Sequence, residues 1–341
     1  MRTLVVSDLH LGSRLGRDVL RLPAVRQVLL EAIDGADRLV LLGDVVELLE
    51  GRPRQAMEIA EPVLRDIGQR VGSGGEVILV PGNHDKALVR PWVRAHQDAL
   101  TVDTAVALDA TPALAQVVSW LAPARVRVHY PGVWLSGRVW ATHGHYLDRH
   151  LLPEAAFGVG RGLLGRLPVG RASPRDYETA GGLSMSRLEA ALTSRMPRPI
   201  ARWVDSVAES LRAGLMPAVQ HRLLRQRVAP LTAWLLGAQM RRAAIPALVH
   251  VVHSLGVDAD WVVFGHVHRY GPLPDDLPLP WRGPQGRPRI ANTGSWVYEP
   301  RLVHRATPPH PYWPGGSVVI EDEGEPRVAG LLDHLDASRL R

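Results

Sequence analysis

The chain has 341 residues, of which 46% are hydrophobic and 22% are charged, and it contains no cysteine. This composition is typical of a globular protein with a full hydrophobic core. The lack of cysteine excludes disulfide bonds, thiolate catalysis and cysteine metal sites. Lys86 is the only lysine, so arginine carries nearly all of the positive charge.

The beginning of the chain predicts a strand rather than a signal peptide, because Asp8 interrupts the apolar run too early for a leader. In the basic middle region, the longest uncharged stretch is Val228 to Met240. Its 13 residues are too few to span a bilayer. We therefore expect a cytoplasmic protein without a transmembrane helix.

The first part of the chain predicts a parallel sheet covered by helices. Apolar runs at 2–7, 39–42 and 76–80 are typical of buried strands, and residues 18–33 and 55–71 have helical spacing. This β-α-β-α-β order is typical of α/β proteins. Shorter strands are predicted further along the chain, at 125–130, 133–135, 138–142, 261–264, 317–321 and 327–332.

The middle of the chain differs from the rest in charge. Leu151 to His250 contain 14 arginines against 6 acidic residues, a net charge of +8, whereas the whole chain has +6. We expect the core to comprise 1–150 and 256–341, with a helical, Arg-rich cap or insert at 151–255. Its helices are predicted at 184–195, 200–213, 217–227 and 231–255.

Side chains that commonly bind metals follow the predicted strands. In α/β sheets ligands bind beyond the carboxyl ends of strands, so we expect these side chains to converge, with Asp44 bridging two metal ions. Mixed oxygen and nitrogen ligands suit Mn, Fe, Zn or Co better than Ca. The segments are Asp8-x-His10, Gly43-Asp44, Gly82-Asn83-His84-Asp85, His143-Gly144-His145 and Gly265-His266-x-His268.

These five segments, in this order, resemble the five-block pattern of the calcineurin-like metallophosphoesterases. The resemblance extends from residue 8 to residue 268. It implies an α/β fold of the metallophosphoesterase type, a two-sheet αββα sandwich, and two divalent metal ions, with Mn the first expectation. It further implies that one ion is held by Asp8, His10, Asp44 and His268, and the other by Asp44, Asn83, His143 and His266.

The resemblance also implies a reaction, the hydrolysis of a phosphoester or pyrophosphate bond by a hydroxide that bridges the two ions. Two cations roughly 3.5–4 Å apart need a shared anion such as the Asp44 carboxylate. His84 is the expected general acid, and Asp85 is expected to orient it by accepting its other ring proton. Further candidates for substrate binding are His145, Asp148, Arg149 and Arg14. Glu47 either hydrogen-bonds a metal ligand or begins the next helix.

Within this family, the layout is similar to that of the UDP-2,3-diacylglucosamine pyrophosphohydrolases, which cleave a lipid-bearing pyrophosphate at a membrane surface. The shared segments are Ser7-Asp8-Leu9-His10-Leu11, Leu42-Gly43-Asp44-x-x-Glu47 and Gly265-His266-x-His268-Arg269. The Gly-Asn-His-Asp segment departs from the Gly-Asn-Arg-Asp of that subfamily. We expect an amphiphilic or nucleotide-linked phosphate as substrate. The basic insert would contact a membrane peripherally, receive an acyl chain, or form a plain helical cap.

Two other functions stay open at this point. The first is a metal-dependent DNA nuclease of the repair-nuclease type, which a basic protein would suit. Nucleic acid is not favoured, because the sequence has no lysine-rich or aromatic groove for a single strand. The second is a non-catalytic scaffold with the same fold, which the complete set of ligand types disfavours. The sequence indicates no obligate protein partner.

Overall fold

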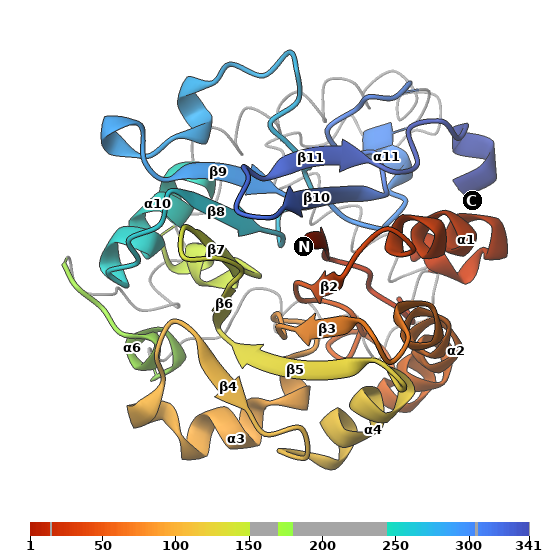
Figure 1. Cartoon of the computed structure of the whole chain (residues 1–341), viewed down its shortest axis with the longest axis horizontal. Helices are drawn as coiled ribbons and strands as arrows, with labels where there is room; N and C mark the ends of the chain where they lie inside the picture. The colour runs from red at the N-terminus through yellow and green to blue at the C-terminus, as the bar shows by residue number, and fades with distance from the viewer. Residues whose placement is uncertain (14–15, 151–169, 180–243, 304–305, 341) are drawn as a thin grey trace, which may run out of the picture.

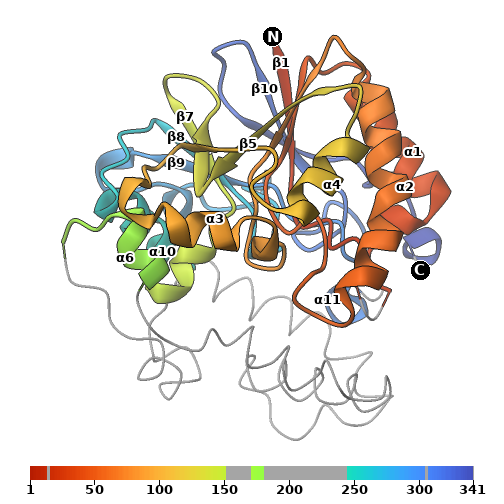
Figure 2. The ribbon, with the colours of Figure 1, turned by 90° about the horizontal axis from the view of Figure 1, so that it is seen from below.

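The computed structural model describes residues 1–13, 16–150, 170–179, 244–303 and 306–340. Two mixed β-sheets lie face to face at the centre, and helices cover their outer faces (Figures 1 and 2). This arrangement confirms the predicted α/β class and the sandwich of two sheets.

The larger sheet has seven strands in the order β11-β10-β1-β2-β3-β5-β4. Its central strands β1, β2, β3 and β5 run parallel, and the three others are antiparallel to their neighbours. The bounds are β1 (Arg2–Val6), β2 (Arg38–Leu41), β3 (Glu76–Leu79), β4 (Thr104–Val106), β5 (Arg125–Tyr130), β10 (Gly316–Glu321) and β11 (Arg327–Gly330).

The smaller sheet has four strands in the order β6-β7-β8-β9, of which β7, β8 and β9 are parallel. The bounds are β6 (Gly132–Trp134), β7 (Val139–Thr142), β8 (Trp261–Phe264) and β9 (Arg289–Asn292). Because β7 and β8 are adjacent and parallel, their carboxyl ends lie side by side at one edge of this sheet.

Alternate side chains of the central strands serve two different cores. Val5, Val40 and Ile78 pack between the two sheets, whereas their neighbours Leu4 and Leu39 pack beneath the outer helices. A strand that is buried on both faces needs apolar residues at every position, which explains the continuous apolar runs of the sequence.

Helices flank the sheets on opposite sides (Figure 2). Three of them cover the large sheet: α1 (Pro23–Ile33), α2 (Pro53–Val71) and α4 (Pro112–Trp120). On the other side, α10 (Ile245–Ser254) and α6 (Pro174–Thr179) pack against the small sheet. The short helix α3 (Arg90–Ala95) lies near β4 in Figure 1, and α11 (Pro300–Val303) lies near the C-terminal end of the chain.

Most predicted elements agree with the structure to within a few residues. The predicted helix 18–33 is divided into a 3₁₀ turn at Val19–Arg21 and helix α1. Leu22 separates them because it is extended, as residues before proline generally are. The predicted helices 184–195, 200–213 and 217–227 lie outside the described residues, and α10 is the described part of 231–255.

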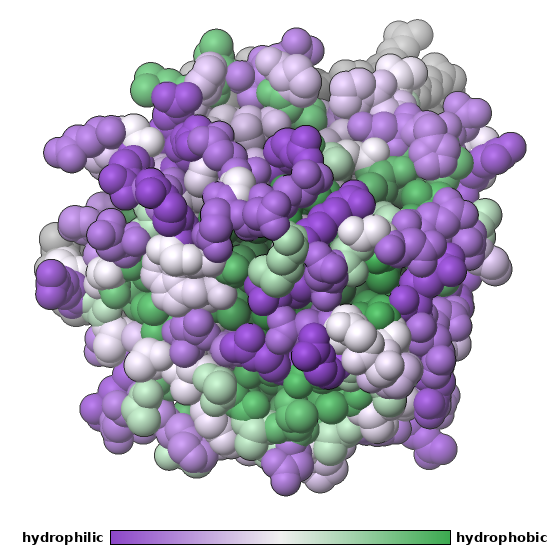
Figure 3. All heavy atoms as spheres, viewed as in Figure 1, coloured by the Kyte–Doolittle hydropathy of each residue, from purple (hydrophilic) through white to green (hydrophobic). Residues whose placement is uncertain are grey.

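The predicted insert is described at 170–179 and 244–255. Tyr177 of α6 and Leu248 of α10 belong to the core beside the small sheet. The boundary of the insert stays a prediction. Among the described residues, no helix is both long and apolar enough to cross a membrane. Hydrophilic side chains cover most of the face seen in Figure 3, with hydrophobic ones in smaller groups between them.

Candidate metal centre

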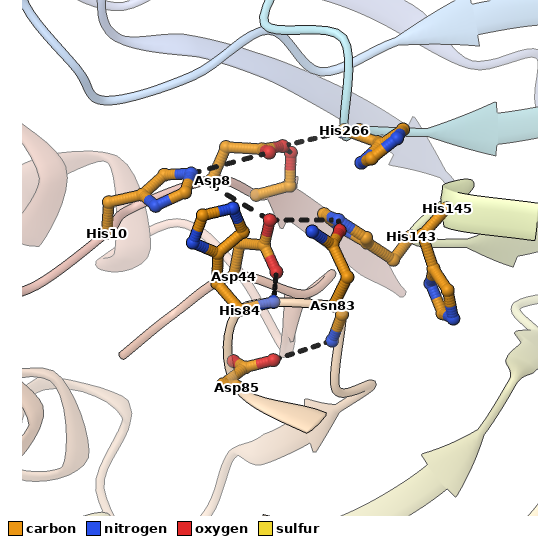
Figure 4. A network of polar contacts seen from close by, with 12 residues as sticks. Asp8, His10, Asp44, Asn83, His84, Asp85, His143, His145 and His266 are labelled. Carbon is orange, nitrogen blue, oxygen red and sulfur yellow. Dashed lines mark hydrogen bonds and ion pairs between the residues drawn. The ribbon is translucent and has the colours of Figure 1, made fainter. Parts of the chain in front are cut away.

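The polar segments that follow five strands converge at one end of the sandwich (Figure 4). Strands β1, β2 and β3 are adjacent and parallel in the large sheet, and β7 and β8 are adjacent and parallel in the small one. Their carboxyl ends therefore meet at one place. The seven predicted metal ligands are all in this region: Asp8, His10, Asp44, Asn83, His143, His266 and His268.

Asp44 lies at the centre of this cluster and is only 1% exposed. Its Oδ1 accepts the backbone N–H of His84 at 2.8 Å. Its Oδ2 lies 3.1 Å from His143 Nε2 and 3.8 Å from His10 Nε2. His143 Nε2 is also 3.1 Å from Asn83 Oδ1. One oxygen is thus fixed by the backbone, and the other faces histidines on two sides, as a bridging carboxylate requires.

The two carboxylate oxygens of Asp8 also differ in their contacts. Oδ2 accepts the backbone N–H of His266 at 2.9 Å and the hydroxyl of Ser7. Oδ1 is buried without a hydrogen-bond donor, 3.2 Å from His268 Nε2 and 3.9 Å from His10 Nε2. A buried carboxylate oxygen without a donor is costly unless a cation neutralises it. This oxygen therefore fits a metal ion held among Asp8, His10 and His268.

Three groups of side chains within the described residues could each hold a metal ion, with ligand atoms within 4.8 Å of one another. Two of them correspond to the two ion positions that the family resemblance implies. The third shares His10 and Asp44 and adds His84. The groups are Asp8, His10 and His268; Asp44, His143 and His266; and His10, Asp44 and His84.

The backbone is strained at most of the candidate ligands. Seven non-glycine residues of the described chain have a positive φ, and five of them are candidate ligands. Each such residue costs on the order of 1 kcal/mol, and such conformations cluster at functional sites. No pattern in the sequence indicated this strain, beyond the tolerance of Asp and His for it. The φ values are 54° at Asp8, 45° at His10, 52° at Asp44, 69° at His266 and 56° at His268.

His84 lies beside Asp44, but Asp85 does not orient it. The Asp85 carboxylate accepts the backbone N–H groups of Val45 at 2.8 Å and Gly82 at 2.6 Å, and so closes its own loop. The His84 Nδ1 is instead 2.8 Å from Glu47 Oε2. The prediction that Asp85 accepts the ring proton of His84 was wrong, because its side chain turns back toward the loop backbone. Glu47 hydrogen-bonds a candidate ligand as well, since its Oε2 lies 2.8 Å from His10 Nδ1.

The buried charges shift the pKa values strongly. Burial alone would raise the pKa of Asp44, but His143, His84 and His10 hold it well below its ordinary value. Burial lowers the pKa of His84, yet Asp44 and Glu47 outweigh it and raise that pKa to about 10. The pKa of His143 is raised to about 9 in the same way, by Asp44 against burial. Burial and the nearby Asp44 raise the pKa of Asp85 to about 6.

The predicted substrate-binding residues lie in different settings. His145 lies at the edge of the cluster, with Nε2 3.2 Å from the Tyr130 hydroxyl (Figure 4). Burial lowers the pKa of His145 well below its ordinary value. Asp148 Oδ1 lies 2.9 Å from His266 Nε2, so Asp148 contacts a candidate metal ligand. Arg149 is half-buried at the end of the same 3₁₀ turn, His145–Arg149. Arg14 lies outside the described residues.

A second buried polar cluster adjoins the loop of His84, and no pattern in the sequence indicated it. Glu178 of α6 lies 2.5 Å from Lys86 Nζ, two residues beyond His84. It also accepts the hydroxyls of Tyr130 at 2.5 Å and Tyr146 at 2.8 Å. The side chain of Glu178 is 8% exposed. This cluster attaches α6 to the rim of the candidate site.

The fold and the site define an α/β protein with two mixed sheets and buried Asp and His clusters that could hold metal ions. The sequence model of the calcineurin-like phosphoesterase family matches residues 1–160. Over these 160 of its 341 residues, the chain is similar to the calcineurin-like metallophosphoesterases. This segment contains the candidate ligands from Asp8 to His143, and the fold brings His266 and His268 to them from beyond the matched segment.

Proposed function

We propose that the protein is a hydrolase of phosphoester or pyrophosphate bonds that depends on two divalent metal ions. The observation that carries this proposal is the position of Asp44 Oδ2, buried between His10 on one side and His143 on the other. The orphaned Oδ1 of Asp8 and the strained backbone of five candidate ligands support it.

The chain offers a complete set of donors for two ions, of which Mn is the first choice and Fe, Zn and Co are alternatives. When bound, such a pair supplies Lewis-acid activation of water and of the phosphoryl oxygens. Asp8, His10, Asp44 and His268 would hold one ion, and Asp44, Asn83, His143 and His266 the other.

His84 would contribute the acid. Its backbone N–H is bound to Asp44 Oδ1, and its Nδ1 is bound by Glu47. Because Nδ1 is bound by Glu47, Nε2 would be the ring nitrogen that donates a proton to the leaving oxygen. Donation lowers the barrier most for substrates whose leaving group is a strong base.

The proposed substrate is an amphiphilic or nucleotide-linked phosphate, as in the UDP-2,3-diacylglucosamine pyrophosphohydrolases that the layout resembles. The net charge of +8 between Leu151 and His250 supports an anionic substrate or a membrane surface. The attachment of α6 through Glu178 to Lys86 supports it too, because this contact brings part of the basic region beside the loop of His84.

The test is hydrolysis by the full chain with Mn²⁺ on a panel of nucleotide pyrophosphates, phospholipids, cyclic nucleotides and DNA, with bis-p-nitrophenyl phosphate as the reference. We expect Asp44→Asn and His84→Ala to lose most of the activity while remaining folded. The matched controls are Asp109→Asn and His334→Ala, whose side chains are exposed. Absence of hydrolysis of the whole panel would favour a scaffold, and preferential degradation of DNA would favour a nuclease.

A further inference from the structure

We propose that Glu47 is a positioning residue that orients two histidines at once, one candidate metal ligand and the candidate general acid. The inference rests on the proposed function. Glu47 is 2% exposed, lies three residues beyond Asp44 and directly follows Val46, which forms a bridge with Leu11.

The carboxylate of Glu47 contacts both imidazole rings. Its Oε2 lies 2.8 Å from His10 Nδ1 and 2.8 Å from His84 Nδ1, and its Oε1 lies 2.9 Å from His84 Nδ1. The two rings are 4.7 Å apart and nearly perpendicular. A carboxylate accepts only, so both rings must donate from Nδ1.

The carboxylate is itself held in place by its own turn. Glu47 Oε1 accepts the backbone N–H of Leu49 at 3.1 Å and of Glu50 at 2.8 Å. The backbone N–H of Glu47 donates to Leu11 O at 3.0 Å, one residue beyond His10. These hydrogen bonds therefore hold the Glu47 carboxylate in a fixed position relative to the two rings.

Because Glu47 binds Nδ1 of each ring, it also determines where the other nitrogen, Nε2, points. With Nδ1 donating to Glu47, the Nε2 of His10 is the nitrogen that faces Asp8 Oδ1 at 3.9 Å and Asp44 Oδ2 at 3.8 Å. The Nε2 of His84 is likewise the nitrogen presented to the substrate. Partners of this kind set the tautomer and direction of a metal-binding histidine, and their loss typically costs about 10–100-fold in metal affinity or activity.

A purely structural role, that of anchoring the turn, is the competing explanation. Glu47→Gln separates the two roles, because an amide has one accepting oxygen and one donating nitrogen. With its oxygen toward Leu49 and Glu50, the glutamine keeps the anchor. Its NH₂ group then faces the Nδ1–H of His10, which opposes the orientation of that ring. The same NH₂ group takes the place of the nearer of the two acceptors of His84 Nδ1, so His84 keeps only the oxygen at 2.9 Å.

The first measurement is calorimetric titration of the metal-free full chain with Mn²⁺. In Glu47→Gln we expect the affinity for one ion to fall about 10–100-fold, while the other ion keeps its affinity. His84→Ala should bind both ions as the unchanged protein does, because the proposed assignment does not include His84 among the ligands of either ion. Glu58→Gln is the matched control, since Glu58 is exposed and contacts Arg54 on the surface of α2.

The second measurement compares two aryl phosphodiesters at saturating Mn²⁺, one with p-nitrophenolate and one with phenolate as the leaving group. Phenolate is the stronger base, so its departure depends more on protonation by the general acid. Glu47→Gln should therefore lose at least tenfold more kcat on the phenyl ester than on the nitrophenyl ester. In a His84→Ala background, Glu47→Gln should leave this ratio unchanged.

Wild-type affinity for both ions together with an unchanged leaving-group ratio in folded Glu47→Gln would overturn the inference. If Glu47→Gln does not fold, Glu47→Asp takes its place, because it keeps the charge but shortens the reach to both rings. Wild-type behaviour of folded Glu47→Asp would then overturn the inference. Failure of the unchanged protein to bind Mn²⁺ would instead refute the proposed function, so the two failures are distinguishable.

Discussion

The backbone N–H of His266 donates to Asp8 Oδ2 across 2.9 Å, although the two residues are 258 positions apart in the sequence. Asp8 follows β1 in the large sheet, and His266 follows β8 in the small one. The bond therefore joins the two sheets at the candidate metal site. It means that Asp8 acquires its orientation only when the sheets have packed together.

Gly265 is required for this contact, because a Cβ at residue 265 would collide with Asp8 Oδ2 and Ser7 Oγ. We expect Gly265→Ala to displace the Asp8 carboxylate and to weaken Mn²⁺ binding at least tenfold, as measured by titration calorimetry. Gly74→Ala is the matched control, since a Cβ at that position meets nothing within 4 Å. Equal Mn²⁺ affinities in the two variants would contradict this role of Gly265.

Metal binding should stabilise the fold. A ligand at about 100 times its Kd adds roughly 2.7 kcal/mol to the free energy of unfolding. For a chain of 341 residues this corresponds to a rise in Tm of about 4 °C. Calorimetric melting with Mn²⁺ should show the rise, and a chelator should reverse it. If neither Mn²⁺ nor the chelator changed the Tm, this would be evidence against a metal site in the folded protein.

Glu178 should matter for stability because its buried carboxylate binds Lys86, Tyr130 and Tyr146. Breaking a buried ion pair from one side typically costs 3–5 kcal/mol, so we expect about 2–4 kcal/mol for Glu178→Gln in this partly exposed pair. Urea unfolding measures the loss. Glu61→Gln, which removes an exposed pair with Arg65, should cost less than about 0.5 kcal/mol. Similar losses in the two variants would disprove the special role of Glu178.

His310 should make the protein less stable in acid. Burial lowers the pKa of His310 to about 4, and the charge of Arg269 acts in the same direction. Between pH 6.5 and 4, the unfolded chain binds a proton here that the folded chain does not, so stability falls as the pH falls through this range.

His310→Asn removes this titration but keeps an acceptor for the N–H of Tyr312, which is 3.3 Å from His310 Nδ1. The free energy of unfolding of the variant, measured by urea at several pH values, should decline less from pH 7 to pH 4.5 than that of the unchanged protein. His334→Asn changes an exposed histidine and should follow the unchanged protein. Parallel pH curves for all three proteins would show that His310 does not titrate in this way.

The positions of the candidate ligands were predictable because each follows a strong local signal. The apolar run 39–42 stops at Gly43, and the carboxyl end of a parallel strand is where ligands bind. Helix α4 also had a signal that could have revealed it, since Thr111 caps its first turn and Pro112 follows at the first helical position.

The partner of His84 was not predictable in this way. Asp85 is its neighbour in the sequence, but Glu47 is its neighbour in the fold. A bridge between Leu11 and Val46 brings Glu47 back beside His10 after β2 has ended, and nothing in the local sequence specifies this return. The positive φ angles of the ligands likewise depend on tertiary contacts, because an isolated chain would relax them.

Asp44 is proposed as a ligand shared by two metal ions, and the number of Mn²⁺ ions bound per chain tests this proposal. Calorimetry and elemental analysis of the unchanged protein should give two ions, and Asp44→Asn should retain at most one, bound weakly. Asp44 would not be the shared ligand if the unchanged protein bound no Mn²⁺, or if Asp44→Asn bound two ions with undiminished affinity.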